Sequence, residues 1–424
     1  MVARDIPTMA KKMATRAKRN LNELLPEEII NNIFLEFSVK DLLRLRSVCK
    51  SWLFLISSPN FVKTHVMIMY NIFLRLSVHD LLRLRSVCKS WLSIISSRDF
   101  IKTRLIISTR DPQFTYHRLL LGGEPLDFAI CSVYSLLREP YTERRLDYSD
   151  ESLLDELLTA TLIDSNVQCV VGCCNGLVCL ASNDGHAIFW NPATRQSRRL
   201  PKPDTIDHFR AYNGFCYDEL NDDYKVIFIY SCSPWPGRSD YKVSVYSSKS
   251  DCWRLIGDFP FLTVSLGGEF ADGAMHWKGR NDTEKENVIV SFDIITEEYQ
   301  DILLPEYGED ENHVTDWTMD TFGGNLSVLL GFRDIRRDFW VMKERDVKEP
   351  WTKLFSIPYN IDGLTNSFYI SPIYISVNGD ILIYSDTTIV VYNSEDQTLK
   401  GLPDGYFQSL SVFSYVESLV SPHL

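Results

Sequence analysis

Apolar residues recur at helical spacing over about the first hundred positions of the chain. Between residues 25 and 37 they form one stripe along a predicted helix, and Pro26 falls in its first turn, where a missing N–H costs nothing. Ser38, three residues before Asp41, is a predicted helix start, and a further helix is predicted around Trp52. Short helices with apolar residues on several faces cannot bury them alone, so this region is predicted to pack on a partner surface.

The helical region contains a tandem repeat. Residues 32–64 recur at 71–103, a shift of 39 positions, with 25 of 33 aligned residues identical. Such high identity indicates a recent duplication of one segment rather than an array of specialised units. The second copy lacks the beginning of the first, because LLPEEIIN at 24–31 is replaced by KTHVMIMY at 63–70.

Two arrangements of the repeat are open at this point. In one, the second copy is a vestigial helical spacer or a gene-model artefact. In the other, the first helix pairs with the later helices of the second copy and the residues between them bulge out. We favour the spacer, because closing a short local loop costs less chain entropy than closing a long one. Near-identical copies nevertheless specify the choice poorly.

From about residue 107 the pattern changes to short aromatic and β-branched runs broken by Gly, Pro, Asn and Asp, which predicts many short strands. One unit recurs in it: an apolar strand that ends in an aromatic residue, a polar turn and a second strand. The aromatic residues are Trp190, Tyr246, Phe292, Trp340 and Tyr392, with Tyr134 as a weaker first member. Their spacing of about 50 residues is typical of kelch-like propeller blades.

Blades of this kind bury their faces only against neighbours, so the units are expected to close into a ring. About six blades fit between residues 110 and 420, and residues 410–416 are the predicted closing strand. A β-sandwich is the second choice, but it leaves the even spacing unexplained. The predicted fold class is therefore α+β and multidomain, with a short, partly duplicated three-helix unit followed by an all-β propeller-like domain of about six blades.

Charge separates the two regions. The chain of 424 residues has a net charge of −12, which combines +11 up to residue 110 with −23 beyond it. An acidic body disfavours nucleic-acid binding, which needs a basic face. The sequence lacks both the roughly 18 consecutive apolar residues of a membrane span and an apolar signal core near its beginning. We expect a soluble, cytoplasmic and/or nuclear protein with no nucleic-acid or membrane partner.

Candidate catalytic or metal-binding chemistry is sparse. Cys169, Cys173, Cys174 and Cys179, with His186 downstream, form a metal-like cluster, but they lack the paired Cys-x2-Cys spacing of a zinc site. We interpret them as core thiols and expect no metal and no cofactor. The phosphate-binding loop and the Gly-x-Ser-x-Gly nucleophile motif are also missing, so we do not predict an enzyme. A propeller hydrolase, with carboxylates and histidine on one rim, is a rival hypothesis.

The first copy of the repeat resembles a plant F-box. The motif runs from Leu25-Pro26-Glu27-Glu28-Ile29-Ile30-x-x-Ile33-Phe34 to Leu42-Leu43-Arg44-x-Arg46-Ser47-Val48-Cys49-Lys50-Ser51-Trp52. The resemblance implies a three-helix module that docks on a Skp-type adaptor and, through it, on the cullin of an SCF ubiquitin ligase. It also implies which residues face the adaptor or form the core of the module: Leu25, Pro26, Ile29, Ile30, Ile33, Leu42, Val48 and Trp52.

The β-rich region resembles the plant F-box-associated domain of type 1, a kelch-like propeller. Matching segments include Cys174-Asn175-Gly176-Leu177-Val178-Cys179, Trp190-Asn191-Pro192, Gly273-Ala274-x-His276-Trp277 and Trp340-Val341-Met342-Lys343-Glu344. In that family the domain binds the substrate, and the family includes S-locus self-incompatibility receptors and immune-regulatory receptors. We accordingly interpret His276 as part of the blade packing.

The expected domains are a basic flexible tail at 1–22, an F-box at 23–64, a partial duplicate or spacer at 65–106 and the substrate-binding propeller at 107–424. The implied function is the non-catalytic substrate-recognition subunit of an SCF ubiquitin ligase, with a target protein on the propeller rim. The alternative is a non-ligase protein-binding propeller whose duplicated F-box has lost adaptor binding.

Overall fold

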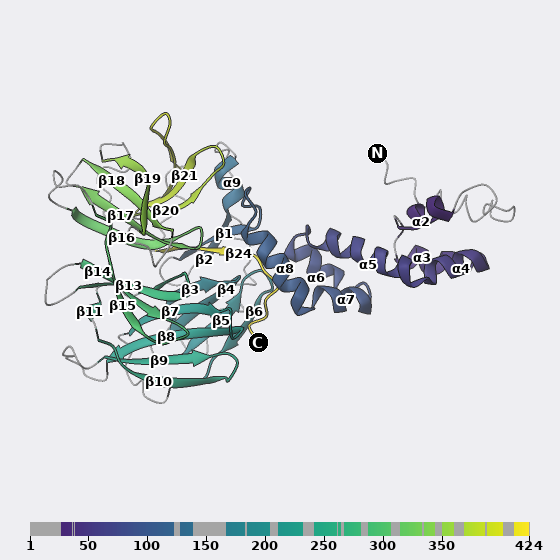
Figure 1. The fold of residues 1–424 in the computed structure, drawn as a ribbon, viewed down its shortest axis with the longest axis horizontal. Helices are drawn as coiled ribbons and strands as arrows, with labels where there is room; N and C mark the ends of the chain where they lie inside the picture. The colour runs from purple at the N-terminus through teal and green to yellow at the C-terminus, as the bar shows by residue number, and fades with distance from the viewer. Residues whose placement is uncertain are drawn as a thin grey trace. The chain divides into compact units, whose positions relative to one another are not determined.

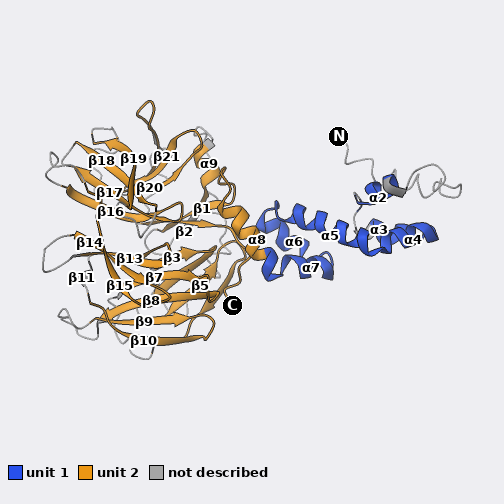
Figure 2. Ribbon diagram, in the orientation of Figure 1, with its two compact units in different colours: residues 1–100 blue, residues 101–424 orange. Residues whose placement is uncertain are grey.

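A computed structural model gives the fold of the chain. It describes residues 27–35, 37, 39–122, 128–138, 167–182, 185–203, 211–231, 241–260, 262–263, 267–280, 287–306, 314–332, 335–343, 350–359, 369–385, 388–401 and 411–423. The chain divides into two compact units, a helical unit at residues 1–100 and a propeller unit at residues 101–424 (Figure 2). Each unit is described separately below.

The helical unit consists of short helices in the order that the repeat predicts (Figure 1). The first copy supplies α2 (Glu27–Leu35), α3 (Val39–Leu45) and α4 (Lys50–Ser57). The second supplies α6 (Val78–Leu84), α7 (Lys89–Ile95) and the first residues of α8 (Arg98–Thr109). Between them runs α5 (Pro59–Phe73), which is one uninterrupted helix.

Serine residues cap the beginnings of two helices in the helical unit. Ser77 is the N-cap of α6, and its hydroxyl oxygen accepts a hydrogen bond from the Asp80 backbone N–H at 3.1 Å. Pro59 opens α5 at a position where the missing N–H is harmless, and Ser58 caps the same helix by accepting from the Phe61 N–H at 3.2 Å. The corresponding Ser38 lies outside the described residues.

The propeller unit is built from six antiparallel sheets within the described ranges, which confirms the predicted propeller of about six blades (Figure 1). Blade 1 consists of β1 (His117–Gly122), β2 (Phe128–Ser132) and β24 (Ser411–Val416), and blade 2 of β3 (Val167–Cys174), β4 (Leu177–Ser182), β5 (Ala187–Asn191) and β6 (Gln196–Arg199). Blade 3 consists of β7 (Ala211–Asp218), β8 (Asp223–Ser231), β9 (Tyr241–Ser247) and β10 (Cys252–Asp258), and blade 4 of β11 (Leu262–Thr263), β12 (Glu269–Ala271), β13 (Ala274–Arg280), β14 (Asn287–Asp293) and β15 (Tyr299–Leu303). Blade 5 consists of β16 (Val314–Phe322), β17 (Asn325–Phe332), β18 (Arg336–Met342) and β19 (Trp351–Pro358), and blade 6 of β20 (Ile370–Ile375), β21 (Asp380–Ser385), β22 (Thr388–Asn393) and β23 (Thr398–Gly401).

Apolar packing between neighbouring blades forms the core of this unit. A separate cluster of buried apolar side chains lies between each successive pair of blades, including the pair formed by blades 6 and 1. Between blades 2 and 3, for example, the ring centroids of Phe189 and Phe215 lie 5.2 Å apart. Each blade therefore buries both of its faces, which a single sheet in isolation cannot do.

The predicted closing strand is confirmed. Strand β24 pairs antiparallel with β1 from Ser411–Gly122 to Val416–His117, so that the C-terminal strand completes the blade that the N-terminal strands begin. The residues that follow are held by Asn191 of blade 2, which is fully buried. Its side-chain amide donates to the carbonyl oxygens of Ser418 at 3.2 Å and Val420 at 2.7 Å.

The five aromatic hairpins of the sequence are the last two strands of blades 2 to 6. In three of them the residue after the aromatic is Asn or Asp, and its side-chain oxygen accepts hydrogen bonds from the backbone N–H groups two and three positions later. The residue four positions after this Asn or Asp has a positive φ: Arg195 at 58°, Glu297 at 60° and Gln397 at 56°. The polar turn is therefore a repeated Asx-type turn that fixes the hairpin.

Tyr134 is not a blade aromatic, and its assignment to a first hairpin was wrong. The segment forms helix α9 (Val133–Arg138). Val133, Leu136 and Leu137 pack into the cluster between blades 6 and 1. Their spacing of three and four residues is the period of a helix face, so a short helix follows the hairpin β1–β2 at this position.

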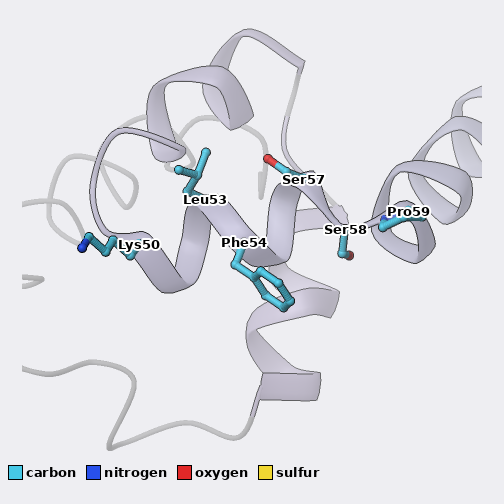
Figure 3. Close-up of a pocket in the computed structure, with 6 residues that line it drawn as sticks. All are labelled: Lys50, Leu53, Phe54, Ser57, Ser58 and Pro59. Carbon is cyan, nitrogen blue, oxygen red and sulfur yellow. The ribbon is translucent and has the colours of Figure 1, made fainter.

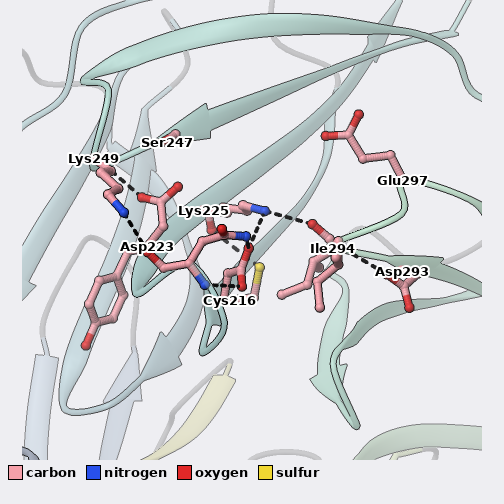
Figure 4. Close-up of polar contacts among 12 residues, drawn as sticks. Cys216, Asp223, Lys225, Ser247, Lys249, Asp293, Ile294 and Glu297 are labelled. Atoms are coloured by element: carbon pink, nitrogen blue, oxygen red, sulfur yellow. Dashed lines mark hydrogen bonds and ion pairs between the residues drawn. The ribbon is translucent and has the colours of Figure 1, made fainter.

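A buried ion pair joins blades 3 and 4. The ammonium of Lys225 in β8 donates to the Asp218 carboxylate at 2.7 Å and to the Ile294 carbonyl oxygen of blade 4 at 2.7 Å (Figure 4). The side chain of Asp218 is 0% exposed and that of Lys225 is 15% exposed. Burial alone would raise the pKa of Asp218, but hydrogen bonds from Asn221 and Lys225 outweigh it and hold that pKa below its ordinary value.

Replacing Lys225 by Met should destabilise the propeller by about 3 kcal/mol, because it leaves a buried carboxylate without its counter-ion. The matched control is Lys242→Met, which breaks the exposed pair of Lys242 with Asp258 and should cost less than about 1 kcal/mol. The free energy of unfolding from denaturant titration measures both. The depressed pKa of Asp218 means that its contribution is present above about pH 4 and is lost as the pH falls below that. The difference between wild type and Lys225→Met should therefore shrink in acid, and a pH-independent difference would contradict this account.

Candidate functional site

The first copy of the repeat is a self-contained helical module. The indole of Trp52 in α4 packs edge-on against the ring of Phe34 in α2, with ring centroids 5.0 Å apart. Around this pair lies a cluster of buried apolar side chains: Ile30, Phe37, Leu42, Leu45, Ile56 and Phe61. Phe61 comes from α5, so the first turns of α5 complete the module. An imidazole nitrogen of His65, in the same helix, lies 3.2 Å from the Phe37 carbonyl oxygen.

The residues that the resemblance marks as adaptor-facing or core fall into distinct groups. Ile30, Leu42 and Trp52 are 7%, 5% and 3% exposed, so they are core residues of the module. Ile33 and Val48 are partly buried against the same cluster. Ile29, at 45% exposed, lies on the surface. Leu25 and Pro26 lie outside the described residues.

The second copy folds around the equivalent pair of aromatic residues. Phe73 at the end of α5 packs edge-on against Trp91 of α7, with ring centroids 5.2 Å apart. Since Phe34 pairs with Trp52 and Phe73 with Trp91, each first helix packs within its own copy. The bulged arrangement, with the first helix on the second copy, is not the one that the structure adopts. Helix α5 therefore serves both copies, as the last helix of the first and the first helix of the second.

An open hollow of about 570 Å³ lies on the first copy where α4 ends and α5 begins. Its lining consists of Lys50, Leu53, Phe54, Ser57, Ser58 and Pro59 (Figure 3). Phe54 is 76% exposed and Leu53 is 42% exposed, so two large apolar side chains stand in water side by side in sequence. The two side chains point to different sides of α4 (Figure 3).

The sequence analysis did not single out Leu53 or Phe54 as exposed residues of the predicted helix around Trp52. Helical periodicity around Trp52 and Ile56 places the core face correctly, but it does not say which further apolar residue stays exposed. A usable signal was present in the repeat itself, because Phe54 is replaced by Ser93 in the second copy.

Two neighbouring carboxylates of the propeller influence each other's ionisation. Glu269 in β12 and Asp320 in β16 lie on the strands through which blades 4 and 5 meet. Burial and the neighbouring Asp320 carboxylate raise the pKa of Glu269 well above its ordinary value. His276 stands opposite Glu269 in the register of β12 and β13. It is fully buried, and its Nε2 lies 3.2 Å from the Ala271 carbonyl oxygen.

Cys173 and Cys174 of the cysteine cluster are partly buried and Cys179 is buried, while the side chain of Cys169 lies outside the described residues. Burial raises the pKa of Cys174 to about 12 and that of Cys173 still further, so both are protonated at neutral pH and are poor nucleophiles. Over the residues that the structure describes, groups of three or more His, Cys, Asp or Glu that could hold a metal ion are not found. In the same part of the chain, no helix is both long and apolar enough to cross a membrane.

Comparison with known proteins agrees with this architecture. The family described as F-box associated beta propeller domain matches residues 127–422, and the F-box domain family matches residues 23–64 and 68–103. The propeller match alone covers more than half of the chain. The chain therefore belongs to the F-box proteins with a C-terminal F-box-associated β-propeller.

The relatives are plant proteins. The F-box/kelch-repeat protein At3g23880 of Arabidopsis thaliana is 29% identical over 381 residues, which covers 87% of each chain. The F-box protein CPR1 of Arabidopsis thaliana is 28% identical over 432 residues, covering 92% of this chain and 88% of its own length. This chain is thus a plant F-box protein. A solved β-propeller domain, that of Myceliophteria thermophila Cps50 (Swd1), has a TM-score of 0.32 at 11% identity and covers 57% of this chain and 86% of that chain.

Replacing Glu269 by Gln should stabilise the propeller by about 1–3 kcal/mol at pH 8 and leave its stability unchanged near pH 4. The raised pKa of Glu269 means that the folded protein favours the protonated carboxyl, so the penalty for ionisation appears as the pH rises through the folded-state pKa. Gln mimics the protonated form and avoids that penalty. Thermal denaturation at both pH values measures the effect, with the exposed Glu306→Gln as the control. An equal effect of Glu269→Gln at both pH values would contradict the interpretation.

Proposed function

We propose that this protein is the substrate-recognition subunit of an SCF ubiquitin ligase. In this proposal the F-box binds a Skp-type adaptor, the adaptor binds the cullin, and the propeller binds a target protein that is to be ubiquitinated. The observation that carries the proposal is the combination of a folded first F-box copy and an F-box-associated propeller in one chain.

The chain would contribute no catalytic group of its own. Its rigid propeller would hold the target close to the ubiquitin-conjugating enzyme, and proximity with correct orientation is enough to accelerate a transfer between two bound partners. The protonated thiols of Cys173 and Cys174 support a binding role, because a buried protonated thiol is a poor nucleophile.

Target binding is assigned to the propeller because it combines rigidity with a net negative charge. The apolar clusters between all successive blades hold its rim in one geometry. The net charge of −23 beyond residue 110 favours a target with a basic surface over a nucleic acid. We place the complex in the cytoplasm, the nucleus or both.

Co-purification of the full chain with a plant Skp-type adaptor tests this function. Wild type should bind, and the double variant Leu25→Ala/Pro26→Ala should lose most of the binding, because the resemblance places both residues at the adaptor-facing beginning of the F-box. Trp91→Ala should retain binding, since Trp91 packs within the second copy and not with Phe34.

A second measurement separates the ligase from a non-ligase binding protein. Once a target is identified, its turnover should depend on Leu25 and Pro26 if the chain works in a ligase. A wild-type chain that recruits no Skp-type adaptor would overturn the ligase function and leave a protein-binding propeller with an inactive F-box region.

A further inference from the structure

The later part of helix α8 is held on the blades by contacts at several points. Ile101 packs against the apolar cluster between blades 2 and 3, and the Lys102 ammonium lies 2.7 Å from the Asp222 carboxylate in the turn between β7 and β8. Further along, the guanidinium of Arg104 is buried and donates to the Glu417 carbonyl oxygen at 3.4 Å. The helix therefore belongs to the propeller unit from Ile101 onward, although it begins in the second copy of the repeat.

A buried histidine fastens the end of this helix. His117 is the first residue of β1 and is 6% exposed. Its imidazole Nε2 lies 3.1 Å from the carbonyl oxygen of Ser108 in the last turn of α8, and its Nδ1 lies 2.9 Å from the hydroxyl oxygen of Tyr374 in β20. One imidazole thus joins α8 to blade 1, where the ring closes, and to blade 6.

The two partners determine which nitrogen of the imidazole carries the proton. A carbonyl oxygen can only accept a hydrogen bond, so Nε2 carries the proton that it donates to Ser108. In the neutral ring Nδ1 is then an acceptor, and the Tyr374 hydroxyl donates to it. Burial raises the pKa of Tyr374, so this hydroxyl keeps its proton throughout the pH range in which histidine titrates. Only the neutral imidazole of His117 can accept from it.

A second proton on the imidazole would disturb this arrangement. It would place an N–H group on Nδ1 opposite the hydroxyl proton of Tyr374, so that the hydroxyl would have to turn away. It would also place a positive charge among aromatic rings, because the ring centroids of Phe114 and Tyr374 each lie 5.3 Å from that of His117. The folded arrangement therefore favours the neutral ring.

The groups around the imidazole act on its charge in both directions. Burial is the largest influence and lowers the pKa of His117, and the positive charge of Arg118, the next residue in β1, acts in the same direction. The hydrogen bond to Ser108 and the Asp111 carboxylate raise that pKa without outweighing burial. Burial would raise the pKa of Asp111 itself, but hydrogen bonds from Thr115 and from the backbone hold it below its ordinary value, so Asp111 stays ionised.

Two further charged side chains lie close to this site. Arg104 in α8 donates to the Ser108 hydroxyl oxygen at 3.4 Å, and Glu417, which follows β24, accepts from the Nε of Arg118 at 3.0 Å. Histidine is the only side chain whose ordinary pKa lies between pH 5 and pH 8. His117 is therefore the group at this junction whose charge responds to mild acid.

From this geometry we propose that His117 is an acid-sensitive latch for helix α8. While the imidazole is neutral, it holds the end of the helix to blades 1 and 6, and when the imidazole is protonated the helix end is released. The boundary between the two units falls within α8, so release loosens the point at which the chain enters the propeller. The latch consists of propeller residues and operates whether or not the F-box binds an adaptor.

The direction of the pH effect follows from the two states of the imidazole. A histidine freed from its site titrates near its ordinary pKa of about 6.5, whereas burial lowers the pKa of His117 in the latched state. Between these two pKa values the released state binds a proton that the latched state does not, so acid favours release. The latch is at full strength above about pH 6.5 and weakens as the pH falls below that value.

Hydrogen–deuterium exchange of the full chain, followed by mass spectrometry and corrected for the intrinsic exchange rate, measures the latch. Amides of residues 105–110 should be protected at about pH 7.5 and should lose at least about threefold of that protection at about pH 5.5. Peptides from the buried strand β8 are the internal reference and should not lose protection.

His117→Gln is the variant that isolates the titration. Glutamine can donate from its amide nitrogen to Ser108 and accept at its amide oxygen from Tyr374, and it does not bind a proton in this range. Residues 105–110 of this variant should keep equal protection at both pH values. His423→Gln is the matched control at an exposed histidine and should show the same acid loss as wild type.

A second measurement observes the imidazole directly. In full-length protein labelled with ¹⁵N-histidine, the ring resonance that is missing from His117→Gln belongs to His117, and it should titrate below about pH 6.5. Titration at or above that value would overturn the proposal. So would wild-type protection that is the same at both pH values, or an acid loss of equal size in wild type and His117→Gln.

Discussion

The propeller depends on one constraint: every blade has two apolar faces, and only another blade can cover each of them. A row of blades would leave two faces in water, so the apolar clusters between blades are complete only when the ring closes. Closure here relies on β24 pairing with β1 and on the fully buried Asn191, which holds the two carbonyl groups that follow β24. The unit therefore behaves as one cooperative body, and a target bound anywhere on it is held in a fixed orientation.

The helical unit satisfies its packing in a different way, with local contacts repeated twice. Each copy needs an aromatic pair, Phe34 with Trp52 or Phe73 with Trp91, and each pair is contributed by residues 18 positions apart. Such local contacts form within a copy without help from the other. The duplication could be accommodated because the last helix of one copy and the first helix of the next merge into α5, so that no extra loop had to be closed.

Much of this architecture was predictable because its determinants are periodic. The five hairpin aromatics, the closing strand and the helix stripes are repeated patterns, and repetition identifies a propeller where one strand would not. Tyr134 was misread because a single aromatic carries no period, and the three-and-four spacing of Val133, Leu136 and Leu137 was the better guide. The hollow at Leu53 and Phe54 could not be predicted from periodicity, which locates the buried face of a helix but not the apolar residues that remain outside it. Nor could the Lys225 bridge to Ile294, which joins residues from two blades.

The proposed receptor would work by proximity, and this constrains how many adaptors it can bind at once. Orientation contributes to the rate only when the two bound partners have one relative geometry, and two equivalent seats would divide the chain between two geometries. A tandem duplication creates that ambiguity at once, because both copies begin with the same surface. Surface substitutions confined to one copy distinguish the two copies without unfolding either, provided that they spare the aromatic pair. Phe54 against Ser93 and Pro59 against Arg98 are differences of this kind, while Phe73 and Trp91 keep the second copy folded.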